Sequence, residues 1–247
     1  MVRQGGSRVR KRWKWSLSIL GLIVIFLIVQ YPFTSEDSTG LSLPLSGKVI
    51  VLDPGHGGID GGASSRAGDL EKDIALQITF ILRDYLQEAG ALVLMTREGD
   101  HDLAAEGTKR IRSRKTEDLK RRVELINGSD ADLFISLHLN AIPTPKWRGA
   151  QTFYNRAVEK SDVLAKQIQA EIIRNLENTS RDARPINSVY LMQQAEIPGA
   201  LVEVGFLSNP TEAELLKTKD YQQSVAASIY EGILRYSYEE PIPGAGQ

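Results

Sequence analysis

The 247-residue chain contains no cysteine and only three histidines. The lack of cysteine excludes disulfide bonds, thiolate metal sites and a cysteine nucleophile. The Gly-x-Ser-x-Gly turn that presents a nucleophilic serine in α/β-hydrolases is also absent, which argues against a serine hydrolase. Imidazoles and carboxylates are therefore the side chains to examine for chemistry.

The folded part of the chain has no excess of positive charge. The net charge is −1, but the first fourteen residues contain six lysines and arginines and no acidic residue, so the remainder is net acidic. Binding of nucleic acid needs clustered basic residues on the folded part. We therefore expect no nucleic-acid partner.

One long apolar run follows the basic start. Residues 16–33 carry no charge over about eighteen positions, which is barely enough for a helix to cross roughly 30 Å of hydrocarbon. A cleaved secretory signal is the alternative, but no small-x-small cleavage motif follows the run. An uncleaved transmembrane signal anchor is therefore favoured. By the positive-inside rule, both alternatives place the residues after 34 outside the cytoplasm.

Composition divides the whole chain into five parts. They are a basic cytosolic start (1–15), the transmembrane anchor (16–33), a polar linker (34–47), one domain (48–236) and a flexible tail (237–247). The linker and the tail are rich in Ser, Gly and Pro. The segment between them shows no internal repeat and has the length of a single domain.

Within this domain, short apolar runs alternate with longer segments of helical apolar spacing. Strands are expected at 48–53, 91–97, 132–141, 149–155, 188–192 and 199–207, and helices at 70–90, 117–128, 161–178, 209–216 and 220–236. The charged stretch 98–115, with His101, is expected to be an exposed loop. The alternation predicts an α/β fold with a mostly parallel twisted sheet of about six strands, covered by helices on both faces. In such sheets, sites form at the carboxyl ends of the strands.

His56 lies in a glycine-rich stretch directly after the first expected strand. A dinucleotide-binding loop would need a glycine where Asp60 stands and a helix immediately afterwards, and a P-loop would need Gly-Lys-Ser/Thr. Nucleotide binding is therefore not expected. The glycines instead let the chain turn tightly, which would bring His56 over the sheet edge as a metal ligand.

Two more residues are expected at that edge. Glu71 heads the apolar stripe that continues with Ile74, so it either complements the helix dipole or serves as a metal ligand. His138 lies near the carboxyl end of its strand, on the face that carries Ser136 and Asn140. A hydrogen-bonded core histidine is the ordinary alternative for His138.

Glu203 is the one carboxylate within the otherwise apolar strand 199–207. Burial of an isolated carboxylate is costly unless its pKa rises or a cation lies nearby. One arrangement explains His56, Glu71, His138 and Glu203 together. Two imidazoles and one carboxylate would hold a zinc ion with an open fourth position, and the second carboxylate would stay free as a base.

Four stretches, in order, carry a resemblance to a known family: LDPGHGGIDGGA, LEKDIAL, ADLFISLHLNA and ALVEVGFLSNPTEAELL. They resemble the zinc-dependent N-acetylmuramoyl-L-alanine amidases of bacterial cell walls, and the resemblance extends from about Lys48 to Tyr236. The basic start, the single hydrophobic segment and the stretches DYLQEAGALVLMTRE and LNAIPTPKWRGAQTFY are most similar to the germination-specific members of endospore formers.

The resemblance implies one Zn²⁺ ion on His56, Glu71 and His138, with Glu203 as the catalytic acid and base. It implies hydrolysis of the amide between N-acetylmuramic acid and L-alanine in peptidoglycan. For the sporulation members it implies removal of stem peptides from spore cortex, before muramic lactam forms, at the forespore or mother-cell envelope. It leaves open whether an accessory protein is needed.

Other functions stay open from the residues alone. One is a wall-binding module with a structural zinc, although such zinc sites usually have four protein ligands and often cysteine. Another is a different zinc hydrolase, such as a carboxypeptidase or a deacetylase. Arg97 and Arg121 are expected to have structural roles rather than to bind substrate carboxylates. For Asn140, substrate contact and orientation of a ligand are both open.

Overall fold

A computed structural model of the chain describes residue 21 and residues 43–242. The expected basic start and transmembrane anchor therefore lie almost wholly outside the described residues, as do residues 34–42 of the expected linker and residues 243–247 of the tail. Among the described residues, no helix combines the length and the apolar character that a membrane span requires. Leu45 is buried, and its backbone N–H donates to Ala89 O at 2.8 Å.

The described residues form one six-stranded sheet with the order β2-β1-β3-β6-β4-β5. The strands are β1 (Val49–Pro54), β2 (Leu92–Met95), β3 (Leu133–Asn140), β4 (Gln151–Tyr154), β5 (Arg184–Pro185) and β6 (Gly199–Phe206). Strands β2, β1, β3 and β6 are parallel neighbours, β4 runs antiparallel to β6, and β5 pairs in parallel with β4. The expectation of a mostly parallel sheet of about six strands is confirmed.

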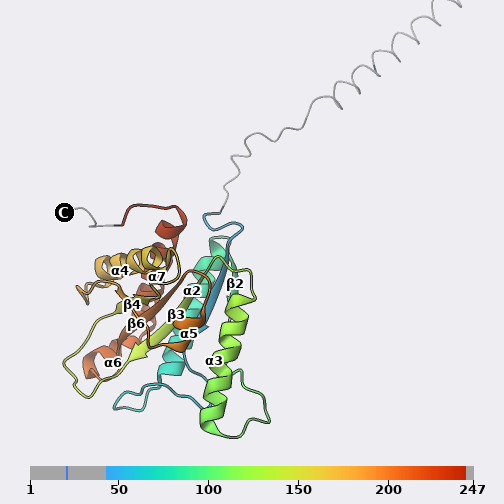
Figure 1. Cartoon of the computed structure of the whole chain (residues 1–247). Coiled ribbons are helices and arrows are strands. Elements are labelled where there is room, and N and C mark those ends of the chain that lie inside the picture. Colours follow the sequence, from blue (N-terminus) through green and yellow to red (C-terminus); the bar gives the residue numbers. More distant parts are fainter. Residues whose placement is uncertain (1–20, 22–42, 243–247) are drawn as a thin grey trace, which may run out of the picture. The chain divides into compact units, whose positions relative to one another are not determined.

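Six helices of the described chain are arranged around this sheet (Figure 1): α2 (Glu71–Glu88), α3 (Ile111–Asn127), α4 (Ser161–Leu176), α5 (Tyr190–Gln194), α6 (Pro210–Leu216) and α7 (Lys219–Ser237). Successive side chains of β3 point to opposite faces of the sheet, so they show which helices pack on each face. Ile135 and Leu137 belong to the core that includes α2, α4 and α7, whereas Phe134 belongs to a second cluster with Ile126 of α3 and Leu191 of α5. Both faces of the sheet are therefore covered.

Two expectations about the elements are wrong. Residues 188–192 were expected to form a strand, but they lead into the short helix α5, with Leu191 and Met192 buried on α3. A five-residue apolar run has the same composition in a buried strand and in a short helix, so periodicity cannot separate them. The sixth strand is instead the two-residue β5, which has no apolar pattern.

The second wrong expectation is the start of α3. Helix α3 begins at Ile111, within the stretch expected to be a loop, and its exposed first turns carry charged residues rather than an apolar stripe. Arg114 lies in these turns, and it donates from Nε and Nη2 to the Asp102 carboxylate at 3.1 and 2.6 Å. Ion pairs with distant residues hold this part of the helix in place of apolar packing. The spacing of apolar residues in the sequence therefore does not predict it.

The sequence predicts a capping box at the start of α6, with Asn209 as the N-cap, Pro210 at the first helical position and Glu212 reaching back to the cap, and the structure confirms this pattern in part. The Asn209 side chain accepts a hydrogen bond from the Glu212 N–H at 3.1 Å, and Pro210 occupies the first helical position. The Glu212 carboxylate, however, does not return to the cap. It accepts hydrogen bonds from the N–H groups of Phe206 and Gly149, both at 2.8 Å, and so ties the end of β6 to the chain before β4.

Candidate metal centre

The carboxyl edge of the sheet brings together three side chains that are far apart in the sequence. His56 follows the end of β1, His138 lies near the end of β3, and Glu71 is the first residue of α2. Their nitrogen and carboxylate oxygen atoms all lie within 4.8 Å of one another, a grouping that can hold a metal ion. Glu71 is buried, and the two imidazoles are a fifth to a quarter exposed.

Glu71 lies between the two imidazoles. Its Oε1 is 3.2 Å from His56 Nε2 and 2.9 Å from His138 Nδ1, and the two rings meet edge to face with centroids 5.0 Å apart. Backbone donors fix the carboxylate as well, because the N–H groups of Leu139 and Ala63 donate to it at 2.9 and 2.7 Å. The three donor groups are therefore already placed around one point.

Glycine is required at two positions beside this cluster. A Cβ at Gly55 would overlap the imidazole ring of His138. A Cβ at Gly62, whose φ is +68°, would meet the Glu71 carboxylate and lie 2.7 Å from a ring carbon of His56. Packing of the two imidazoles and the carboxylate against bare backbone explains why the stretch around His56 is rich in glycine.

The electrostatics of the cluster favour a positive charge at its centre. Burial would lower the pKa of His56, but hydrogen bonds to Asp60 and Glu71 raise it to about 9. Burial would raise the pKa of Glu71, but hydrogen bonds to His138 and His56 hold it well below its usual range. An ionised Glu71 between two imidazole donors is the charge arrangement that suits a divalent cation.

Glu203 stands beside His138 in the sheet. The two residues are paired in the parallel register of β3 and β6, so their side chains lie next to each other on the same face. The Oε2 atom of Glu203 is buried and has no hydrogen-bond partner among the described residues. Burial raises the pKa of the Glu203 carboxyl to about 7. An unpaired carboxylate next to the cluster is available to accept and return a proton.

Two buried arginines hold the loop that carries His56. Arg97 donates to the carbonyl oxygens of Pro54 and Gly55 at 3.0 and 2.9 Å. Arg122 donates to Pro54 O at 2.9 Å and to His56 O at 2.5 Å. His56 has a left-handed backbone with φ of +61°, a conformation that costs about 1 kcal/mol for a residue with a Cβ. The two arginines bind the carbonyl oxygen of Gly55, before His56, and that of His56 itself, and so stabilise this backbone conformation.

Asp53 and Asp118 both form buried ion pairs with Arg122 at the carboxyl edge of the sheet, the second at 2.9 Å. Arg122 Nη1 is 2.7 Å from Asp53 Oδ1, and both side chains are 2% exposed. Hydroxyl groups of Thr96 and Ser136 donate to the two oxygens of Asp53, each at 2.6 Å. Burial would raise the pKa of Asp53, but Arg122 and these two hydroxyl groups lower it to about 2.

Replacing Asp53 by asparagine is expected to lower the free energy of unfolding by about 2 kcal/mol at pH 7, because the substitution removes one of the two carboxylates that pair with the buried Arg122 charge and leaves only Asp118. The effect should depend on pH. A carboxyl whose pKa is depressed on folding contributes stability above its unfolded value near 3.8, and that contribution is lost as the pH falls toward 2. Urea denaturation at pH 7 and pH 3 measures both quantities.

The matched control is Asp84→Asn, since Asp84 is an exposed acid whose ion pair among the described residues is with the adjacent Arg83 at 2.8 Å. It should change the free energy of unfolding by less than about 0.5 kcal/mol. A similarly small loss for Asp53→Asn, or a loss that grows at pH 3, would contradict the buried ion pair as a stabilising element.

The remaining residues named from the sequence lie outside the cluster. Arg97 is structural, as expected, although its partners are carbonyl groups rather than surface acids. Arg121 is exposed and pairs with Glu117 at 2.8 Å. His101 is exposed. Asn140 lies two residues beyond His138, next to a register irregularity between β3 and β6.

Sequence reasoning missed Arg122, Asp53 and Asp60. Arg122 is the second arginine of an Arg-Arg pair in a charged helix, a pattern typical of a solvated face, yet it is 1% exposed. Asp53 ends an apolar strand and could have been noticed as Glu203 was. Asp60 follows His56 by four residues, and its Oδ2 lies 3.0 Å from His56 Nδ1.

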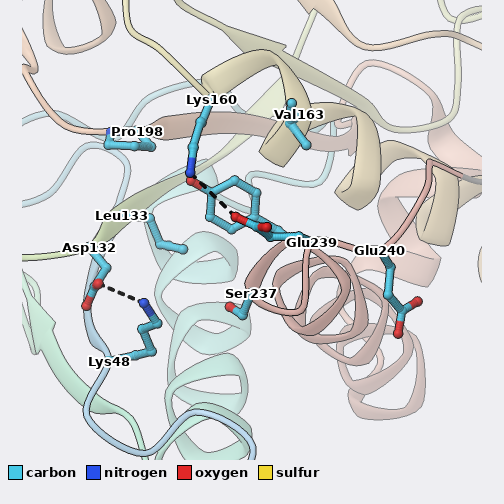
Figure 2. A pocket seen from close by; sticks show the side chains of 10 residues that line it. Lys48, Asp132, Leu133, Lys160, Val163, Pro198, Ser237, Glu239 and Glu240 are labelled. Atoms are coloured by element: carbon cyan, nitrogen blue, oxygen red, sulfur yellow. Dashed lines mark hydrogen bonds and ion pairs between the residues drawn. The ribbon is translucent and has the colours of Figure 1, made fainter.

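A cavity of about 470 Å³ lies far from this centre. Figure 2 shows it lined by residues that precede the strands, among them Lys48, Asp132 and Pro198, so it sits at the amino edge of the sheet. The ion pairs Lys48–Asp132 (3.0 Å) and Lys160–Glu239 (3.6 Å) border it. The chemical groups described above are all at the carboxyl edge, which is therefore the candidate site.

A second cavity, of about 360 Å³, lies at the carboxyl edge itself. Its walls come from the loop that precedes Glu71, from the segment after β3 and from the turn after β6, and they include Ser65, Arg66, Ile142 and Ser208. These segments adjoin the elements that carry Glu71, His138 and Glu203.

Comparison with known proteins gives a consistent result. Residues 50–235 match the family described as N-acetylmuramoyl-L-alanine amidase. The germination-specific N-acetylmuramoyl-L-alanine amidase of Bacillus subtilis is 57% identical over 236 residues, which cover 95% of this chain and 99% of that protein.

Solved structures agree with the sequence matches. The CwlD amidase from Clostridioides difficile, determined in complex with the GerS lipoprotein, matches with a TM-score of 0.76 and 43% identity over 78% of this chain and all of that chain. An N-acetylmuramoyl-L-alanine amidase from Clostridium difficile 630 matches with a TM-score of 0.69 and 29% identity over 78% of this chain and 98% of that chain.

Proposed function

The chain belongs to the N-acetylmuramoyl-L-alanine amidase family, and from this premise we propose that it hydrolyses the amide bond between N-acetylmuramic acid and L-alanine in peptidoglycan with one zinc ion held by His56, Glu71 and His138. The observation that carries the proposal is the convergence of two imidazoles and a buried carboxylate at the carboxyl edge of the sheet, next to an unpaired carboxylate.

The donor set fits zinc. Two imidazoles and one carboxylate are the ligands of a catalytic zinc site that keeps a fourth position open, and zinc accepts this mixture of nitrogen and oxygen donors. With neutral imidazoles and an ionised Glu71, the centre carries a net charge of +1. When bound, zinc supplies a Lewis acid that polarises the scissile carbonyl and acidifies the attacking water.

Glu203 is the proposed acid and base. Its carboxylate takes a proton from the attacking water as the oxygen adds to the lactyl carbonyl carbon. It then gives this proton to the nitrogen of L-alanine as the carbon–nitrogen bond breaks, so a carboxylic acid and a free amine are released. The buried, unpaired Oε2 supports this role, because no other group of the described chain competes for the proton.

The substrate we propose is the cortex peptidoglycan of a spore. Support comes from the high identity to a relative named as germination-specific, together with its coverage of nearly the whole chain. Removal of the stem peptide exposes the lactyl carboxyl, which a later reaction needs in order to form muramic lactam. Because peptidoglycan lies outside the cytoplasm, we infer an extracytoplasmic site of action at the sporulating cell's envelope, with residues 16–33 as the proposed membrane anchor.

A protein partner is part of the proposal. The related amidase from Clostridioides difficile was determined in complex with a lipoprotein. We infer that this chain also acts with an accessory protein at the outer surface of a membrane.

Digestion of purified cortex peptidoglycan is expected to release stem peptides that begin with L-alanine and to leave glycan with free lactyl groups. Mass spectrometry of the fragments, together with labelling of new amino termini, measures both products. Removal of metal by a chelator should stop the reaction, and added zinc should restore it.

The products separate the alternatives. A deacetylase would release acetate, a carboxypeptidase would release a single terminal amino acid, and a wall-binding module would leave the peptidoglycan intact. Any of these results, with no new alanine amino terminus, would contradict the proposed amidase reaction.

A further inference from the structure

Asp60 lies directly behind the imidazole of His56. Its Oδ2 is 3.0 Å from His56 Nδ1, whereas the other ring nitrogen, Nε2, faces Glu71 Oε1 at 3.2 Å. One carboxylate therefore occupies the ring nitrogen that points away from the cluster. The nitrogen that points toward the cluster remains for the metal.

Asp60 is itself held by helix α3. Lys115 Nζ is 2.7 Å from Asp60 Oδ1, and the Gly62 N–H donates to the same oxygen at 3.3 Å. Seven residues further along α3, and so on the same side of the helix, Arg122 donates to His56 O at 2.5 Å. Helix α3 thus reaches His56 twice, through Asp60 to the ring and through Arg122 to the main chain.

His56 needs such support. It lies in a loop with a left-handed backbone at φ of +61°, and its side chain is a quarter exposed, so neighbouring atoms do not enclose the ring completely. A histidine that binds a metal usually donates its second N–H to a carboxylate or carbonyl group, which fixes both the tautomer and the ring orientation.

We propose that Asp60, held in place by Lys115 of α3, is a positioning residue that keeps the His56 imidazole in the orientation and tautomer in which Nε2 faces the metal. This inference rests on the proposed zinc centre. In this arrangement, Nδ1 of His56 carries the hydrogen and donates it to Asp60, and the lone pair of Nε2 points into the cluster.

The contacts of Asp60 distinguish this role from a purely structural one. Its partner Lys115 is 46% exposed, and an ion pair at such a position contributes little to folding. Substitution of Asp60 should therefore weaken metal binding far more than it destabilises the fold. The two effects are measured separately on the same protein.

The test is the zinc affinity of the full chain, purified and stripped of metal, in competition with a chromophoric chelator. Asp60→Ala should bind zinc about 10- to 100-fold more weakly than the wild type. Asp60→Asn keeps a hydrogen-bond acceptor without its charge and should give an intermediate loss. Lys115→Met should weaken binding by up to about fivefold, since it removes only the ion pair behind Asp60.

Two further measurements complete the test. The visible spectrum of the cobalt-substituted protein reports ligand geometry and should differ between Asp60→Ala and the wild type. The control is Lys166→Met, because Lys166 forms a similarly exposed ion pair with Asp162 at 2.7 Å on α4, remote from the cluster. The control should leave zinc affinity and the cobalt spectrum unchanged.

Zinc affinity and a cobalt spectrum of Asp60→Ala equal to those of the wild type would overturn the positioning role and leave the zinc centre standing. A loss of affinity matched by equal destabilisation of the metal-free protein would also overturn it. Failure of the wild type to bind zinc at all is a different result, since it would overturn the proposed function itself.

Discussion

Replacement of Glu203 by glutamine is expected to lower kcat for stem-peptide release by about 10³-fold while the protein keeps one equivalent of zinc. Glutamine has nearly the same shape but cannot take a proton from water or return one to the leaving amine. Glu203→Ala should behave in the same way, because Glu203 is not one of the three grouped donors. Initial rates on cortex fragments and metal analysis of the same samples test both statements.

Glu203→Gln should lose activity without losing stability. A buried carboxylate oxygen without a hydrogen-bond partner destabilises the folded protein, and burial raises the pKa of this carboxyl to about 7. The neutral amide avoids the cost of burying a charge, so Glu203→Gln should unfold at the same or a higher temperature than the wild type when both lack metal.

Glu212 provides the matched control, because it is a second buried carboxylate near the end of the same strand. Both of its oxygens accept backbone hydrogen bonds, at 2.8 Å from Gly149 N and 2.8 Å from Phe206 N. Glu212→Gln should lower the free energy of unfolding by about 1–2 kcal/mol and leave turnover nearly unchanged. If Glu203→Gln kept more than about a tenth of the wild-type kcat, Glu203 would not be the acid and base.

The difference between these two glutamates shows what the sequence can predict about the site. Glu203 stands out because it interrupts an apolar strand, and the structure places it beside His138 with an unpaired oxygen. Glu212 looks from the sequence like part of a helix cap, and only the structure shows its bonds to Phe206 and Gly149. The sequence shows that a carboxylate in an apolar strand would be energetically unfavourable to bury. It does not show which groups that carboxylate contacts, because those groups lie in distant segments of the chain.

The sheet was predictable because its signal is local. Strand β3 alternates between two buried faces, and α2 repeats apolar residues at helical spacing, so both follow from periodicity. The parallel arrangement then places His56 and His138 at one edge without further information. Helix α5 and the first turns of α3 were not predictable in this way, because one is too short and the other is held by ion pairs.

The contacts that support the candidate metal site were the least predictable part. Arg122 lies 66 residues from His56, and Lys115 lies 55 residues from Asp60. In a helix rich in arginine and lysine, either residue has the pattern of a solvated surface charge. Only the folded chain shows that Arg122 is buried against a main-chain carbonyl group and that Lys115 contacts the carboxylate behind His56.

The double variant His56→Ala/His138→Ala is expected to lose its zinc, from about one equivalent to less than about 0.1, and with it all measurable turnover. It removes two of the three donor groups. Glu71 should stay in place, because the N–H groups of Ala63 and Leu139 still hold its carboxylate, but one carboxylate does not retain zinc against dialysis. Metal analysis after gel filtration gives the zinc content directly, and His138→Ala alone should lose both zinc and turnover.

The chain offers a control of the same residue type, since His101 is its third histidine and is exposed. His101→Ala should keep full zinc content and full activity. Circular dichroism of the double variant must show the wild-type helix content, because the His138 ring also fills the space above Gly55 and its removal leaves a gap. If the folded double variant still carried a full equivalent of zinc, the zinc would have to bind at another site. Glu203 would then not lie beside the zinc and could not accept a proton from a water molecule bound to it.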